Sequence, residues 1–224
     1  MPTRPLLGFW VGLFVMLGLG AFMTVACLGS LTQQGARPRP VKQPVVPDIS
    51  RPKVIKALRA KLTRSTVIKG VPHVKQRPDF CGEACAEMYL RKLGARIDQD
   101  EIFARCAVRP DQGRGCVTRE LQKALRSTGF QVGATWYNIA AKRAQEQLAA
   151  QFVALFRDLL LGIPSIVCMH YDDQPNTTEH FRLILGYDKK TDEVIYHEPA
   201  MQHGAYKRMK RTLFLKLWPL KYST

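Results

Sequence analysis

The sequence is short of acidic side chains and lacks the patterns that bind zinc. It has 18 Asp and Glu residues against 34 Lys and Arg residues in a chain of 224. It contains no paired Cys-x-x-Cys and no His-x-x-x-His, so a zinc site is not expected. It also shows no internal repeat and no cofactor-binding motif, and we expect no cofactor. The length suffices for one domain with its own core and an accessory segment.

The formal net charge of +16 indicates attraction to polyanions such as nucleic acid, acidic lipid or acidic cell-wall polymer. The basic residues are spread along the chain and are not interleaved with aromatic residues. We therefore predict no specific nucleic-acid partner. A solvated basic surface without a dedicated partner is the simpler interpretation, with an acidic polymer or lipid surface as the alternative.

Six cysteines are too few to form a disulfide framework in a chain of this length. Cys106 and Cys116 flank the loop RPDQGRG, which is rich in Gly and Pro. A bridge between these two residues is a hypothesis that applies to an exported domain.

The segment Leu6–Leu28 is an almost uninterrupted apolar run without charge. It is long enough to span a bilayer, whereas the apolar part of a cleaved signal peptide is usually about 7–15 residues. We predict an N-terminal membrane anchor within residues 1–31, with a cleaved signal segment and secretion as the alternative. We place the domain on the non-cytoplasmic side, although the basic residues after the span favour the opposite orientation by local charge count.

Residues 32–66 read as a Pro-rich, basic linker. Its first part, Thr32–Pro52, contains five prolines and has no apolar period, which is typical of an extended spacer. The segment Val54–Val67 is either a basic amphipathic helix that contacts acidic lipid or the solvated first helix of the domain.

Residues 67–224 carry helical patterns first and strand patterns afterwards. We predict helices over residues 81–94, 97–108, 118–129 and 138–161 from apolar spacing and capping residues. Asp98 and Glu101 form a capping pattern at the start of the second helix, and Thr118 is the expected cap of the third. We predict strands over residues 131–137, 165–170, 180–187 and 193–197. This order indicates an α+β fold in which N-terminal helices pack on an antiparallel sheet.

The stretch Gln76–Gly94, QRPDFCGEACAEMYLRKLG, places Cys81 in the first turn of a helix that stops at Gly94. Unpaired amides and the positive dipole end of a helix favour a thiolate. We expect the pKa of Cys81 to fall below its free value of about 8.5. Cys85 lies one turn later, and we interpret it as a buried apolar residue.

The segment Val71–Gly94 resembles the nucleophile region of the peptidase C-39-like family. These are papain-like cysteine peptidases related to bacteriocin leader-processing enzymes. HFRLILGYD at His180–Asp188 and VIYHEPA at Val194–Ala200 are weaker resemblances in the same order. The resemblance implies a papain-like fold, with a nucleophilic Cys on a helix and a His on the sheet.

Cysteine acyl transfer needs a thiolate, a base and donors for the oxygen that becomes negatively charged. Cys81 supplies the thiolate. Among five histidines, His180 is the candidate base, because it begins a predicted strand after a polar loop and occupies the family's His position.

A third group orients the imidazole. The family places an Asp before a Pro here, and this chain has Glu198 before Pro199. Glu198 is one methylene longer, and a salt bridge at the rim is the alternative role. We expect Glu198→Gln to reduce activity far more than stability. Gln76 is the candidate oxyanion donor, together with the Cys81 amide. It lies five positions before Cys81, whereas the spacing in the family is more often six positions.

The leading hypothesis is a membrane-tethered cysteine peptidase that acts on a peptide or protein substrate. One alternative is an amidase for cell-wall or isopeptide bonds. Another is a non-catalytic papain-like module that binds acidic polymers or peptides.

Overall fold

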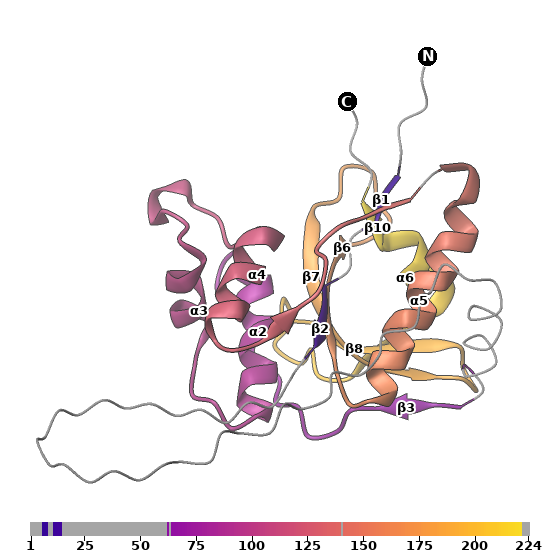
Figure 1. Ribbon diagram of the computed structural model, residues 1–224, viewed down its shortest axis with the longest axis horizontal. Coiled ribbons are helices and arrows are strands. Elements are labelled where there is room, and N and C mark those ends of the chain that lie inside the picture. Colours follow the sequence, from indigo (N-terminus) through magenta and orange to yellow (C-terminus); the bar gives the residue numbers. More distant parts are fainter. Residues whose placement is uncertain (1–5, 9–10, 15–61, 63, 140, 221–224) are drawn as a thin grey trace, which may run out of the picture.

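A computed structural model describes residues 6–8, 11–14, 62, 64–139 and 141–220 (Figure 1). Its centre is an antiparallel meander of strands β6 (Ser165–His170), β7 (Glu179–Asp188), β8 (Glu193–His197) and β9 (Lys207–Lys210). The apolar run SIVCMH and the run FRLILGY make β6 and β7 suited to the middle of a sheet, where both faces are covered. Three of these four strands, β6, β7 and β8, were predicted within one residue at each end.

Register decides which side chains of β7 reach which core. Met169 pairs with His180, and Ile166 pairs with Leu183. Phe181, Leu183 and Leu185 alternate onto one face, whereas Ile184 lies on the other face. The two faces of the meander therefore carry two separate cores.

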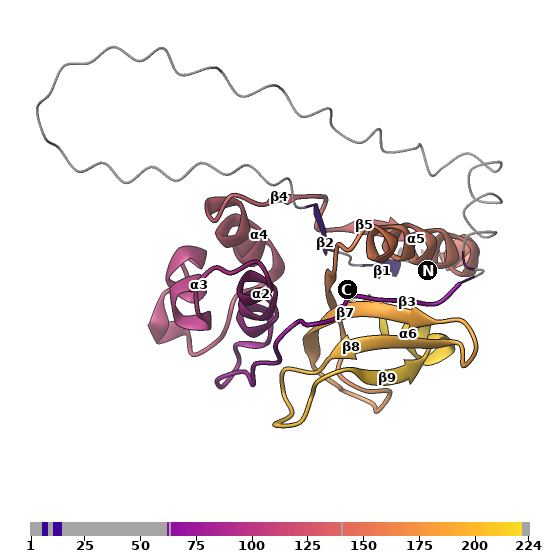
Figure 2. The same cartoon turned by 90° about the horizontal axis from the view of Figure 1, so that it is seen from below.

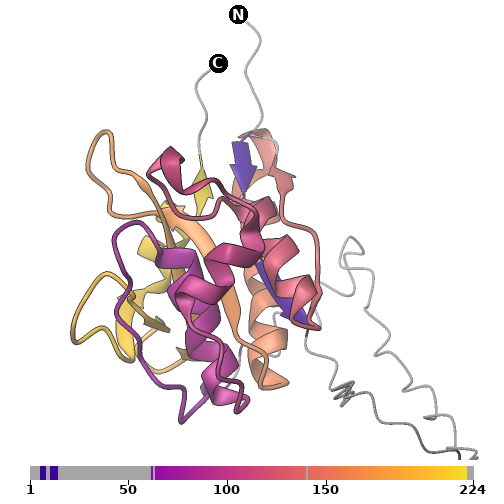
Figure 3. The ribbon, with the colours of Figure 1, turned by 90° about the vertical axis from the view of Figure 1, so that its left-hand side faces the viewer.

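Helices cover these two faces separately. Helices α2 (Cys81–Lys92), α3 (Gln99–Cys106) and α4 (Thr118–Ser127) gather on one side, as Figures 2 and 3 show. Helices α5 (Ala144–Leu160) and α6 (Arg211–Leu217) lie on the other side. The first core contains Cys85 and Met88, and the second contains Phe156 and Trp218. The expected α+β architecture of helices on an antiparallel sheet is confirmed.

Short strands extend the sheet. β3 (Thr66–Val67) pairs with β7, and β2 (Val11–Phe14) joins β6 to β4 (Gln131–Val132). β1 (Leu6–Gly8) lies between β10 (Pro219–Leu220) and β5 (Tyr137–Ile139) in a separate sheet. Two 3-10 turns, Pro110–Gln112 and Ala141–Arg143, complete the described elements.

These strands change the interpretation of the N-terminus. The seven described residues of the predicted membrane span, Leu6–Gly8 and Val11–Phe14, form strands, so a continuous helix is wrong for them. The physical reason is that an apolar run without a period fits a buried strand as well as a helix. The rest of the span lies outside the described residues. Within the described part of the chain, no helix has both the length and the hydropathy needed to cross a bilayer.

Three smaller expectations also change. The helix predicted over residues 138–161 begins only at Ala144, because β5 and a 3-10 turn precede it. Thr118 is the first residue of α4, and Val117 is its N-cap. Most of the segment Val54–Val67 lies outside the described residues, and its last two residues form β3. The capping pattern of Asp98 and Glu101 is confirmed at the start of α3.

Candidate active site

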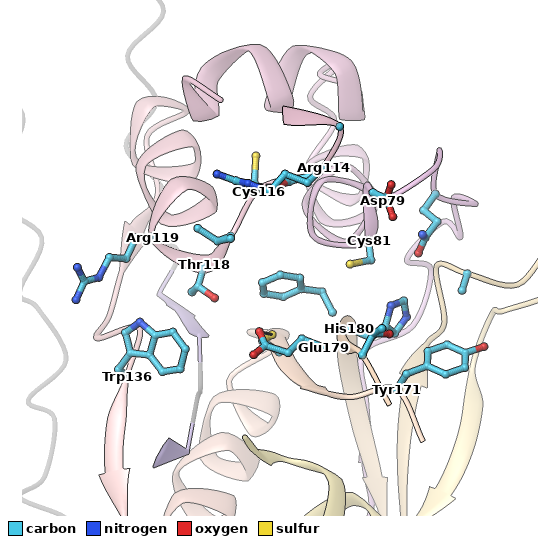
Figure 4. Close-up of a pocket in the computed structure, with 18 residues that line it drawn as sticks. Asp79, Cys81, Arg114, Cys116, Thr118, Arg119, Trp136, Tyr171, Glu179 and His180 are labelled. Atoms are coloured by element: carbon cyan, nitrogen blue, oxygen red, sulfur yellow. Dashed lines mark hydrogen bonds between the residues drawn. The ribbon is translucent and has the colours of Figure 1, made fainter. Parts of the chain in front are cut away.

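A cavity of about 980 Å³ lies between the start of α2, the loop before α4 and the start of β7. Figure 4 shows Cys81 and His180 at one end of this cavity, with Trp136 and Arg119 at the other end. Gln76 also lines the cavity, and Glu198 lies behind His180. Three of the four residues singled out from the sequence therefore share one cavity, and the fourth contacts one of them.

Cys81 is the first residue of α2, and its side chain is half-buried. Burial raises the pKa of the Cys81 thiol to about 11, although the amides of Phe181, Gly82 and Cys81 itself lower it. The nearby charge of Glu83 raises it further. The expectation of a lowered pKa is therefore wrong for the resting site. The helix amides act in the expected direction, but desolvation of the sulfur is the larger effect.

His180 is the second residue of β7, and its side chain is buried. Its Nε2 lies 2.5 Å from Oε1 of Glu198. The ring of Tyr171 packs edge-on against the imidazole, with the ring centroids 5.1 Å apart. All five histidines of the chain are described, and only His180 lines the cavity. His197, by comparison, is buried and bonded to the backbone of Val71 and Tyr206.

Glu198 directly follows β8 and is 3% exposed. Its Oε1 accepts hydrogen bonds from His180 and from the amide of Ala200, at 3.1 Å. Its Oε2 accepts a hydrogen bond of 2.7 Å from Nε of Arg182. Burial alone raises the pKa of this carboxyl, but His180, Arg182 and the Ala200 amide outweigh burial and hold it below its usual value. Glu198 is therefore an ionised carboxylate at neutral pH. It lies inside the domain, which excludes a salt bridge at the rim.

Gln76 lies on the segment that leads into α2. Its backbone amide donates a hydrogen bond of 2.9 Å to the carbonyl of Pro199, which ties this segment to the residue after Glu198. Its side-chain Oε1 is buried and has no hydrogen-bond partner among the described residues. The structure thus brings the Gln76 side chain to the cavity that contains Cys81.

The loop that forms the upper wall of the cavity is fixed at several points. A disulfide joins Cys106 of α3 to Cys116 of this loop. The fully buried Glu83 accepts a hydrogen bond of 2.6 Å from the Cys116 amide. A Cβ atom at position 115 would lie 2.0 Å from the carbonyl oxygen of Asp79, so only Gly115 allows the loop to approach the turn before α2 so closely.

The side chains of Glu83, Cys106 and Cys116 form the one cluster of potential metal ligands found among the described residues. The two sulfur atoms are bonded to each other and so are not thiolates. A metal site needs deprotonated sulfur ligands, and this cluster does not provide them.

Sequence reasoning missed several residues around the candidate site. Arg182 lies on the same face of β7 as His180, and the pattern His-x-Arg in a predicted strand is a signal for this. Tyr171 and Trp136 reach the cavity from segments distant in the sequence, so no local pattern identified them.

A comparison with known protein families agrees with this geometry. No curated protein matches the chain. A family model described as the Peptidase_C39 like family matches residues 68–223, which include all four candidate site residues. Because the match spans more than half of the sequence, the chain belongs to the Peptidase_C39 like family, whose members are cysteine peptidase-like domains.

Proposed function

We propose that the domain is a cysteine peptidase that hydrolyses a peptide bond in a peptide or protein substrate through an acyl-enzyme on Cys81. The observation that carries the proposal is the buried contact of 2.5 Å between His180 and Glu198 at the wall of a cavity that also contains Cys81. A nucleophile, a base and a carboxylate that orients the base in one cavity are typical of acyl transfer.

The proton of Cys81 is the first requirement of the reaction. With a pKa of about 11, the thiol keeps its proton at neutral pH, so a base must remove it. Nε2 of His180 is engaged by Glu198, which leaves Nδ1 as the ring nitrogen for this transfer. The ionised Glu198 then stabilises the imidazolium that forms.

The thiolate next attacks the substrate carbonyl carbon, and the carbonyl oxygen becomes negatively charged. The backbone amide of Cys81 and the side-chain amide of Gln76 are the proposed donors to this oxygen. His180 gives its proton to the departing amine as the peptide bond breaks. A water molecule then attacks the thioester, and His180 accepts its proton. The bond between carbon and sulfur breaks, the acid product leaves, and His180 returns the proton to the Cys81 sulfur.

Alkylation by iodoacetamide tests this arrangement without a known substrate. We expect Cys81 to be alkylated at neutral pH much faster than Cys168, which is 1% exposed. His180→Gln should slow alkylation of Cys81 about 10²-fold or more, the usual range for loss of a positioned base. His203→Gln is the matched control, because His203 is exposed and outside the cavity. Mass spectrometry of the Cys81 peptide measures the rate.

Peptidase activity itself is measured with a library of unmodified peptides, and Cys81→Ser provides the blank. Cleavage by the wild-type chain and none by Cys81→Ser is the expected result. Alkylation of Cys81 no faster than that of Cys168, with no cleavage of any peptide, would instead support a binding module without catalysis.

Attachment to a membrane, with the domain outside the cytoplasm, is a further proposal. The apolar run Leu6–Leu28 and the disulfide between Cys106 and Cys116 support it, because disulfides persist mainly outside the cytoplasm. Leu6–Gly8 and Val11–Phe14 pair in the sheets, so the part of the run proposed for membrane attachment begins after Phe14. Protease treatment of intact cells tests the proposal: digestion of the domain supports it, and full protection refutes it.

A further inference from the structure

Arg182 is a buried charged residue that has no part in the proposed chemistry. The residue is 4% exposed, and it lies two positions after His180 on β7. Leu183 pairs with His197 across β7 and β8, so continuing this register places Arg182 directly opposite Glu198. Burial of an arginine is costly unless each of its polar groups finds a partner.

Every nitrogen of the Arg182 guanidinium has such a partner. Nε donates to Oε2 of Glu198 at 2.7 Å. The two terminal nitrogens donate to the carbonyls of His170 and Tyr171, at 3.2 Å and 2.7 Å. The rings of Tyr171 and Tyr196 lie 5.4 Å and 5.6 Å from the guanidinium carbon. The guanidinium of Arg182 is therefore fixed in one orientation by Glu198, by the backbone at the end of β6 and by the rings of Tyr171 and Tyr196.

Through these contacts Arg182 reaches two groups that contact the His180 ring, Glu198 and Tyr171. It binds the oxygen of Glu198 that His180 does not use. It also holds the backbone of Tyr171, whose ring packs against the imidazole. A glutamate side chain has several rotatable bonds, so it needs an additional contact to stay aligned with the imidazole.

We propose that Arg182 is a positioning residue that fixes Glu198 and Tyr171 around His180. This inference rests on the proposed function, in which His180 acts as the base for Cys81. Arg182 does not line the cavity, so it acts through the two groups that it holds.

The effect of Arg182 on pH dependence follows from the charges that surround the imidazole. Around the cluster of His180, Glu198 and Arg182, the titratable groups are Tyr171, Tyr196, Cys85 and His73, whose Nε2 lies 2.9 Å from the Glu198 carbonyl oxygen. Cys81, Cys168 and Glu179 line the cavity beside His180. Of all these groups, only Arg182 carries a permanent positive charge. Its removal raises the pKa of Glu198, because Arg182 is one of the groups that lower it.

The test compares iodoacetamide rates at Cys81 between pH 4 and pH 9 in the wild-type chain and in Arg182→Met. We expect the rate at pH 7 to fall about 10–100-fold, since a small misplacement of a catalytic group has effects of this size. We also expect the acid limb of the profile to move about 1 pH unit or more toward higher pH. The reason is that Glu198 then takes up a proton at a higher pH. A purely structural role would not move this limb.

Three further variants complete the test. Arg182→Lys keeps the positive charge but loses the planar guanidinium with its several donors. Its acid limb should stay at the wild-type pH, and its rate should fall less than that of Arg182→Met. In the Glu198→Gln background, Arg182→Met should leave the acid limb in place, because no carboxyl remains at position 198 to titrate. Arg208→Met is the matched control, because Arg208 bridges the carboxylates of Asp188 and Glu193 outside the cavity.

The outcomes separate the two proposals. Wild-type alkylation that does not depend on His180 would refute the proposed function. Wild-type alkylation that depends on His180, together with Arg182→Met and Arg182→Lys profiles equal to that of Arg208→Met, would refute the role of Arg182 alone. Should Arg182→Met not fold, the Arg182→Lys profile decides, with intact Arg182→Lys rates at every pH counting against the proposal.

Discussion

The most specific prediction concerns Glu83, a buried carboxyl in the first turn of α2 that contacts the loop containing Cys116. Its side chain is fully buried, Oε1 accepts from the Cys116 amide, and Oε2 has no hydrogen-bond partner among the described residues. Burial raises the pKa of Glu83 from 4.5 to about 7, against the opposing effect of the Cys116 amide. The folded protein therefore retains a proton on Glu83 over a pH range in which the unfolded chain has already released it.

This difference makes the stability of the protein fall as the pH rises. The folded state binds more protons than the unfolded state between about pH 4.5 and pH 7, so the free energy of unfolding decreases across this window. The total effect is about 3 kcal/mol, since one pKa unit corresponds to about 1.4 kcal/mol. About 2.5 kcal/mol of it falls between pH 5 and pH 8. Above pH 7, the folded protein has lost the stability that protonation of Glu83 gives it at lower pH.

Glu83→Gln removes this titration. Urea unfolding of the oxidised protein at pH 5, 6, 7 and 8 gives the free energy of unfolding of both proteins. We expect the variant to gain about 2.5 kcal/mol relative to the wild-type chain between pH 5 and pH 8. A constant offset reports only how well the amide fits, so the slope with pH is the diagnostic quantity.

Glu120→Gln is the control on the same loop, because Arg114 binds Glu120 with two hydrogen bonds and lowers its pKa. Its stability relative to the wild-type chain should not increase with pH. A difference between Glu83→Gln and wild type that stays constant within about 0.5 kcal/mol over this range would refute the assignment of a neutral, buried Glu83.

Two further predictions concern stability. Glu198→Gln should cost about 3–5 kcal/mol of folding free energy in addition to activity, because it leaves the buried guanidinium of Arg182 without its carboxylate; urea unfolding checks this, and a loss below about 1 kcal/mol would contradict it. This prediction differs from the expectation drawn from the sequence, in which activity falls far more than stability, because the sequence did not show the contact between Glu198 and Arg182. Replacing both Cys106 and Cys116 by Ser should cost about 2–3 kcal/mol, as expected for a bridge with a sequence separation of 10; equal urea midpoints for the wild-type chain with and without reductant would show that the bridge contributes nothing.

The local parts of the fold were the most predictable from the sequence. The capping residues Asp98 and Glu101 identified the start of α3, and the apolar runs identified β6, β7 and β8. The segment before α5 was predicted as helix but forms β5 and a 3-10 turn. Its pairing partner β1 lies more than a hundred residues away, and local propensity carries no information about such a partner.

The four candidate site residues were recognisable because their chemistry is linked to local sequence. Cys81 at a helix start, His180 at a strand start and Glu198 before a proline are all readable from neighbouring residues, and the family resemblance gave their order. The direction in which the pKa of Cys81 shifts was not readable in this way. It depends on how much water the folded chain removes from the sulfur, and only the packing of the whole domain determines that.

The sequence by itself therefore determined the class of fold, the helix that carries Cys81 and the residue types available for acyl transfer, because these follow from spacing and local backbone preferences. Only the tertiary structure decided that Arg182 binds Glu198, that Glu83 lies beneath the Cys106–Cys116 loop, and that Leu6–Phe14 contributes strands. These features depend on which distant segments meet and on the register in which they pair, and the free energies of buried charges are set by that arrangement.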